Sequence, residues 1–131
     1  MLVNPSILLY SHPIENTGAY LQSLVETIVL RENIIIARHM DQLVKILRQP
    51  LNGVVAAIIF ANNEEELHEL IALQDQLQRI PFILILPDQE KEFVTKAHSL
   101  RPRYLAYADS DLSDVRDVFK RIVGKANSVW H

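Results

Sequence analysis

Short, dense apolar segments alternate with amphipathic segments along the whole chain. The apolar segments are rich in β-branched residues and lack polar alternation, as is typical of strands that a parallel sheet buries on both faces. They span residues 7–10, 34–37, 54–61, 82–86 and 104–107. The amphipathic segments carry apolar residues at helical spacing on one face, and they span residues 20–28, 43–47, 67–77, 93–100 and 112–122. The pattern predicts five strands and five helices in strict alternation.

Polar and helix-breaking residues mark the expected ends of several helices. Asn63, with Glu66 three residues later, has the spacing of a helix start, where such side chains satisfy backbone N–H groups of the first turn. Pro81 is expected to stop the third helix before the fourth strand. Gly124 is expected to end the last helix in a left-handed conformation. We therefore expect one domain over residues 1–124 and a C-terminal tail over residues 125–131.

Strict alternation of strands and helices predicts an α/β fold with a parallel sheet. Each crossover must return the chain to the same end of the sheet, and right-handed crossovers place helices on both faces. For one domain of 131 residues we expect a flavodoxin-like three-layer sandwich with five parallel strands in the order 2-1-3-4-5.

The composition fits a globular domain that needs no covalent or metal staples. The chain has 13 basic and 16 acidic side chains, a formal charge of −3, and 49% hydrophobic residues. It has no cysteine, which excludes disulfides, thiol catalysis and thiolate metal sites. The mild acidity argues against nucleic acid binding, which normally uses a clustered basic face. The longest apolar run, residues 54–61, is too short to span a membrane, and no signal-peptide pattern is present, so a cytoplasmic protein is expected.

Candidate site residues follow the strands, because ligands of doubly wound sheets bind outside the carboxyl ends of the strands. These positions hold Ser11 and His12, then Ala61, Asn62 and Asn63, then Leu86, Pro87 and Asp88, and finally Tyr107, Ala108 and Asp109. Isolated histidines without cysteine partners, and glycines outside any Gly-rich loop, predict neither a metal site nor a nucleotide cofactor. Residues 64–66 are all Glu, and we attribute this cluster to the positive end of a helix dipole.

The order and length of the elements, together with the stretch Tyr104-Leu105-Ala106-Tyr107-Ala108-Asp109-Ser110-Asp111-Leu112, carry a family resemblance over residues 7–123. The chain resembles the CheY-like receiver domain of two-component response regulators. Such domains hold Mg²⁺ with an acidic pair after the first strand and accept a phosphoryl group on an Asp after the third. They also use a Thr or Ser after the fourth strand and a Lys after the fifth.

Carried over to this chain, the family's site positions hold other residue types. The acidic pair falls on Ser11 and His12, which lack the carboxylate oxygens that Mg²⁺ prefers. The phosphoacceptor falls on Ala61, and a shift by one residue reaches only Asn62, an amide. The hydroxyl and Lys positions fall on Leu86 and Tyr107. The resemblance therefore implies a degenerate pseudo-receiver that is not phosphorylated.

One receiver feature does match. Tyr104 lies three residues before the Lys position, where family members carry an aromatic residue that acts as a rotameric switch.

Two functional hypotheses follow. The first is a non-enzymatic signalling module that acts by protein–protein contact, as a homodimer or an adaptor, through the face of the fourth helix, fifth strand and fifth helix. That face carries Lys91, Lys96, Arg101, Arg103, Asp111, Asp114, Arg116, Asp117 and Lys120. The second is a small-molecule-binding or enzymatic domain that uses Ser11, His12, Asn62, Asn63 and Asp88. It requires a pocket of about 300 Å³ or more at the strand ends. In either case the chain could belong to a longer regulator.

Overall fold

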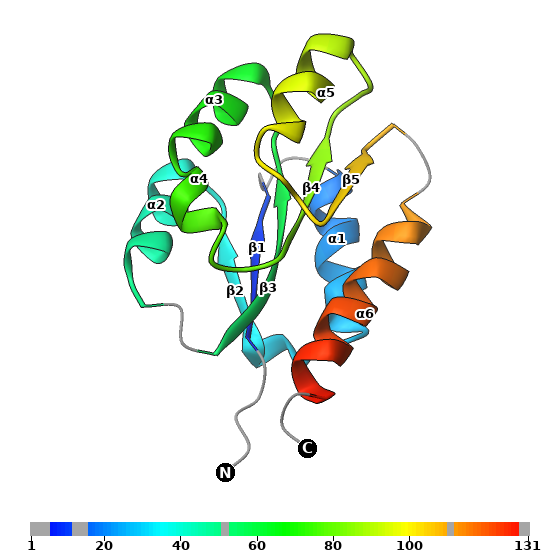
Figure 1. Ribbon diagram of the computed structural model, residues 1–131. Helices are drawn as coiled ribbons and strands as arrows, with labels where there is room; N and C mark the ends of the chain where they lie inside the picture. The colour runs from blue at the N-terminus through cyan, green and yellow to red at the C-terminus, as the bar shows by residue number, and fades with distance from the viewer. Residues whose placement is uncertain (1–5, 12–15, 51–52, 110–111, 129–131) are drawn as a thin grey trace.

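The computed structural model describes residues 6–11, 16–50, 53–109 and 112–128, which form a three-layer sandwich (Figure 1). The strands are β1 (Ser6–Tyr10), β2 (Ile34–Ala37), β3 (Val54–Phe60), β4 (Phe82–Leu86) and β5 (Tyr104–Tyr107). The helices are α1 (Asn16–Glu26), α2 (Met40–Arg48), α3 (Glu64–Ala72), α4 (Gln74–Leu77), α5 (Lys91–His98) and α6 (Ser113–Ser128), with a 3₁₀ helix, η1 (Arg31–Asn33), before β2.

The five strands form one parallel sheet in the order β2-β1-β3-β4-β5. This order confirms the prediction from the alternating pattern. Because β2 and β5 are the outer strands, the centre of the sheet is β1, β3 and β4. The carboxyl ends of all five strands lie along the same edge, where the loops to the helices begin (Figure 1).

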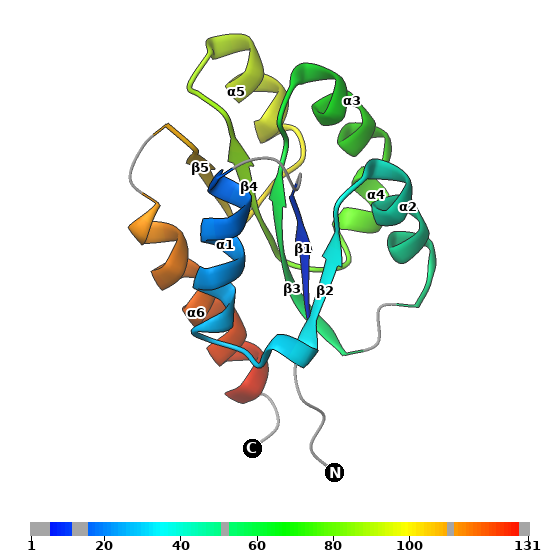
Figure 2. The same cartoon turned by 180° about the vertical axis from the view of Figure 1, so that it is seen from behind.

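Helices cover both faces of the sheet, and this explains why the strands are apolar on both sides. The helices α1 and α6 pack on one face, and α2, α3, α4 and α5 pack on the other (Figures 1 and 2). In β1, Ile7 and Leu9 face the first group of helices, whereas Leu8 and Tyr10 face the second. Consecutive strand residues point to opposite faces, so a strand covered on both sides has no position left for solvated polar residues.

Between β3 and β4 the structure corrects the prediction of a single helix. The helix α3 ends at Ala72, and Leu73 has φ −100° and ψ 12°, outside the helical range. The Leu73 N–H bonds to the carbonyl of Leu70, three residues back, at 2.9 Å. This tightened turn reorients the chain, so the short helix α4 can bury Leu77 in the core.

The predicted end of the last helix at Gly124 is also wrong. The helix α6 continues through Gly124 to Ser128, so residues 125–128 of the expected tail are helical, and residues 129–131 lie outside the described part of the chain. Gly124 lies on the exposed side of this helix, and its φ is not positive. The sequence rule failed because a glycine ends a helix only where the chain turns left-handed, and here the apolar face of α6 continues to bury Val123.

Replacing Gly124 with alanine should therefore stabilise the protein. A Cβ at Gly124 would meet no atom within 4 Å. Alanine avoids the backbone entropy penalty of a helical glycine, so the free energy of unfolding should rise by about 0.5–1 kcal/mol. Urea denaturation followed by circular dichroism measures this change.

Gly53 provides the matched control, because its φ is 85°. Gly53→Ala should lower the free energy of unfolding by about 1–2 kcal/mol, since alanine is strained in that region. A Gly124→Ala variant less stable than the wild type would contradict the helical assignment.

Candidate functional site

The sequence-predicted site residues that the structure describes do lie at the carboxyl edge of the sheet. Ser11 directly follows β1, Ala61 directly follows β3, and Leu86 and Tyr107 are the last residues of β4 and β5. Strand pairing brings the ends of β3, β4 and β5 together. The Ala61 N–H after β3 bonds to the Ile85 carbonyl of β4 at 2.9 Å, and Leu86 of β4 is in register with Tyr107 of β5. His12 lies outside the described residues, as does Asp111 of the predicted docking face.

The side chains at these strand ends are largely buried and apolar. Ala61 and Leu86 are fully buried, Ser11 is 4% exposed, and Tyr107 packs partly buried against the α2–α5 side of the core. Mg²⁺ requires several oxygen ligands in octahedral geometry. Alanine, leucine, a buried serine and a tyrosine do not provide such a donor set, so the described residues at these positions do not fit the ion that receivers bind.

A buried carboxylate lies just beneath this edge, on the first turn of α3. Glu66 is 8% exposed, and its Oε2 accepts a 2.6 Å hydrogen bond from the hydroxyl of the fully buried Tyr10. Its Oε1 accepts bonds from the backbone N–H of Asn62 at 2.9 Å and from the Asn62 Nδ2 at 3.2 Å. Both carboxylate oxygens are therefore satisfied inside the protein, and they tie α3 to β1 and to the loop after β3.

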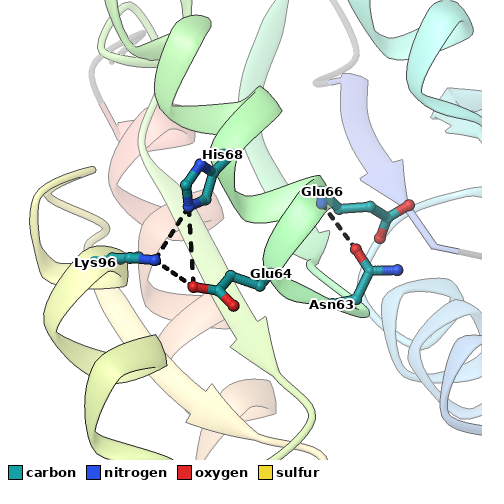
Figure 3. Close-up of polar contacts among 5 residues, drawn as sticks. All are labelled: Asn63, Glu64, Glu66, His68 and Lys96. Carbon is teal, nitrogen blue, oxygen red and sulfur yellow. Dashed lines mark hydrogen bonds and ion pairs between the residues drawn. The ribbon is translucent and has the colours of Figure 1, made fainter.

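The Asn63 to Glu66 spacing that predicts a helix start is confirmed. Asn63 is the N-cap, and its Oδ1 accepts the Glu66 N–H at 2.8 Å (Figure 3). The Glu66 side chain bonds to the N–H of Asn62, the residue before the cap, and not to the N–H of the cap itself as in a capping box. The run of three glutamates predicts three side chains at the helix dipole, whereas Glu66 turns inward. A buried strand tyrosine that needs a partner was the available signal.

Burial and the nearby Glu66 carboxylate both raise the pKa of Tyr10 well above its ordinary value. Burial is the larger cause, because the phenolate would lose its hydration. A tyrosinate would also lose the proton that it donates to Glu66. Tyr10 is therefore a neutral hydrogen-bond donor under all ordinary conditions, so it offers no acid or base chemistry near neutral pH.

On the opposite side of the α3 start, Glu64 and His68 meet Lys96 of α5 (Figure 3). The Lys96 ammonium donates to the Glu64 Oε1 and lies 3.1 Å from the His68 Nε2. The His68 Nε2 also lies 4.0 Å from the Glu64 Oε1. The hydrogen bond from Lys96 and its charge lower the pKa of Glu64. The cluster is solvent-exposed and joins α3 to α5 by polar contacts.

A surface depression of about 350 Å³ opens between the loops that follow β3 and β4. Its lining includes Asn62, Asn63, Glu64, Pro87, Asp88, Glu90, Glu92 and Phe93. The volume meets the size expected of a small-molecule site, and Asn62, Asn63 and Asp88 line it as that hypothesis requires. Ser11 does not line it. The Asn62 side-chain amide donates to the Glu66 carboxylate, and the Asn63 side-chain carbonyl accepts the Glu66 N–H. The Asp88 Oδ1 accepts the Glu90 N–H at 3.0 Å.

Tyr104, the position of the receiver switch aromatic, lies on the opposite face of the sheet from Tyr107. Its ring packs partly buried on the α1 and α6 side, and its hydroxyl lies 3.5 Å from Asp114 Oδ2 of α6. Partial burial and the Asp114 carboxylate raise the pKa of Tyr104. The contact links β5 to the first turn of α6.

Among the described residues, no three His, Asp or Glu side chains gather in a way that could hold a metal ion. Over the same ranges, no helix is both long and apolar enough to cross a bilayer.

Replacing Tyr10 with phenylalanine should remove the donor to Glu66 Oε2 and leave a buried carboxylate oxygen without it. The free energy of unfolding should fall by about 1–3 kcal/mol near neutral pH. The unfolded wild type releases the Tyr10 proton near the ordinary pKa of about 10, whereas the folded state holds it to higher pH. The wild type should therefore lose stability above about pH 10, and the variant should lose less.

Urea titrations at about pH 7 and about pH 10.5 measure both effects. Tyr20→Phe is the matched control, because Tyr20 is 47% exposed, and this change should leave the stability at both pH values nearly unchanged. A Tyr10→Phe variant as stable as the wild type would show that Glu66 does not depend on Tyr10.

Comparisons with known proteins agree on the fold. No protein-family model matches the sequence, and no curated protein sequence matches it either. A signal receiver domain from Pseudomonas fluorescens superposes with a TM-score of 0.74 at 19% identity, over 96% of this chain and 99% of that one. A CheY-like response regulator receiver domain from Methanospirillum hungatei superposes with a TM-score of 0.71 at 12% identity, over 96% of this chain and 98% of that one. A putative pilus assembly-related protein from Burkholderia pseudomallei superposes with a TM-score of 0.67 at 18% identity, over 95% of this chain and 94% of that one. This chain has the fold of CheY-like receiver domains.

Proposed function

We propose that this chain is a receiver-type signalling module that acts through protein–protein contacts and does not accept a phosphoryl group. The observation that supports this most directly is the fully buried Ala61 at the end of β3. Transfer of a phosphoryl group to a protein carboxylate requires a carboxylate nucleophile that the donor can reach. The methyl group of alanine has no such chemistry.

The surrounding residues support the same proposal. A developing phosphoryl charge needs a cation and hydrogen-bond donors aimed at it. Leu86 and Tyr107 end the two neighbouring strands and provide neither an ammonium nor an aliphatic hydroxyl there. The buried carboxylate of this region, Glu66, accepts internal hydrogen bonds at both oxygens. A nucleophilic role would break the contacts that anchor α3, so we assign Glu66 a structural role and the module no enzymatic activity.

The face made by α5, β5 and α6 is the proposed docking surface. It carries exposed basic side chains on α6, among them Arg116 and Lys120, beside the acidic Asp114 and Asp117. The contact between Tyr104 and Asp114 couples β5 to α6, so a partner that binds this face meets both elements in a fixed arrangement. Charges of both signs favour a specific and salt-sensitive interaction with a complementary protein.

A small-molecule function has less support. The depression beside Asn62 has adequate volume, but the polar atoms of Asn62 and Asn63 named above are committed to Glu66. Binding pockets usually combine an apolar lining with a few convergent polar groups, and here the lining is dominated by exposed carboxylates.

Incubation with Mg²⁺ and acetyl phosphate should leave the intact mass of the protein unchanged, because no acceptor carboxylate lies at the described strand ends. An active receiver domain treated in parallel is the positive control. Intact-mass spectrometry at neutral pH detects one added phosphoryl group directly. A stoichiometric adduct would refute the proposal, and its loss in Glu66→Gln would identify Glu66 as the acceptor.

Reversing two charges on α6 should abolish partner binding while the fold is kept. Immobilised wild-type protein and the Arg116→Glu, Lys120→Glu double variant are compared for proteins captured from an extract of the source organism. Lys45→Glu on α2 is the matched control, since it reverses an exposed charge on the other side of the sheet. A protein captured by the wild type and the control should be depleted at least about tenfold with the double variant. Equal capture by all three proteins would exclude this face as the docking surface.

A further inference from the structure

The outer edge of β2 is an unpaired strand edge that carries apolar side chains. Only β1 pairs with β2 among the described residues, because β2 is the terminal strand of the sheet. Its sequence is Ile-Ile-Ile-Ala, and Ile35 is 36% exposed. Natural proteins usually shield such an edge with charges, prolines or a covering element, because it can pair with another strand. Here the four strand residues contain neither a charge nor a proline.

The backbone groups that face outward can be identified from the pairing with β1. The Ala37 carbonyl accepts the Ser11 N–H at 3.2 Å, so Ala37 and, two residues earlier, Ile35 turn their backbone groups toward β1. Ile34 and Ile36 therefore turn theirs outward. The Ile34 N–H is bonded to the Arg31 carbonyl within the turn of η1. The outer edge thus offers the Ile34 carbonyl together with the N–H and carbonyl of Ile36.

Opposite charges flank the two ends of this edge. Glu32 lies two residues before β2, and Arg38 directly follows it. Both side chains are exposed, and neither forms an ion pair with another described residue. The neighbouring Arg31 is paired with Glu26 at 3.4 Å and so does not compensate Glu32 by itself.

We propose that a second copy of this chain pairs with the β2 edge in antiparallel orientation, about a two-fold axis at Ile35. The start of each strand then lies beside the end of the other, which brings Glu32, in the η1 turn just before β2, to the same end of the pair as the partner's Arg38. The Ile36 N–H donates to the carbonyl of the partner's Ile34, and the reciprocal bond forms by symmetry. Ile35 meets the partner's Ile35 at a position without hydrogen bonds, where cross-strand side chains approach most closely.

Self-complementarity is the reason for choosing a second copy over an unrelated strand. A two-fold axis makes the same patch serve both partners, and an acid at one end with a base at the other matches only when the two strands run in opposite directions. The limited number of outward N–H groups makes this a weak, reversible dimer. Because β5 lies at the other edge of the sheet (Figure 1), the dimer leaves both α5–β5–α6 faces open and so presents two docking surfaces.

Sedimentation equilibrium between about 10 μM and about 1 mM tests the proposal. The wild type should form a reversible dimer that weakens as salt is added, because exposed ion pairs are screened. Glu32→Lys and Arg38→Glu should each weaken the dimer by at least about tenfold, since each places like charges opposite each other at both ends. Ile35→Lys should abolish it. Glu65→Lys, an equal change of charge on α3, is the control and should have no effect.

Mixing the Glu32→Lys and Arg38→Glu single variants in equal amounts gives the sharpest outcome. At one end of the mixed pair the two substituted side chains, an ammonium and a carboxylate, face each other, and at the second end the native Glu32 and Arg38 meet. A heterodimer of near wild-type affinity should therefore form. The double variant should likewise recover a homodimer. Circular dichroism confirms that each variant is folded.

A wild type that remains monomeric at about 1 mM would overturn the proposal. A dimer that persists unchanged in all three variants of the β2 edge would also overturn it, because another face would then hold the copies together. Neither result bears on phosphoryl transfer or on capture by the α6 face.

Discussion

Burial of one parallel sheet on both faces is the constraint on which the rest of this structure depends. Each strand of the centre must supply apolar side chains in both directions, and the helices on each face must cover them without gaps. The same constraint reaches the carboxyl edge, where Ala61 and Leu86 are fully buried. Among the described residues at this edge, Tyr10, Asn62, Asn63 and Glu66 therefore use their polar groups in hydrogen bonds to one another.

The Glu66 carboxylate shows how this is achieved. Receiver domains place charged groups where the strands end, whereas this chain places its buried charge on α3 and satisfies it with Tyr10 and Asn62. A buried charge is tolerated only when it is well hydrogen-bonded. The network therefore locks the loop after β3 into one conformation. In the proposed function, this region is a fixed support for surfaces elsewhere.

The two outer strands then divide the remaining surface. The edge of β5, with α5 and α6, combines exposed charges of both signs, whereas the edge of β2 combines an exposed isoleucine with one acid and one base at its ends. The first is suited to a complementary partner and the second to an identical copy. Because the sheet separates these edges, the two proposed contacts do not compete.

The alternation of apolar and amphipathic segments determined the fold class and strand order, because two-sided burial and right-handed crossovers leave few topologies for five strands. The Asn63 cap was also readable, since capping depends on neighbours in sequence. The break at Leu73 and the continuation of α6 through Gly124 could not be predicted from the sequence, because they depend on which side chains pack into the core. Only the tertiary structure brought Tyr10 to Glu66, 56 residues away, and left Glu32 and Arg38 without an ion pair among the described residues. Sequence patterns report local spacing, whereas these features depend on distances between segments that meet only after folding.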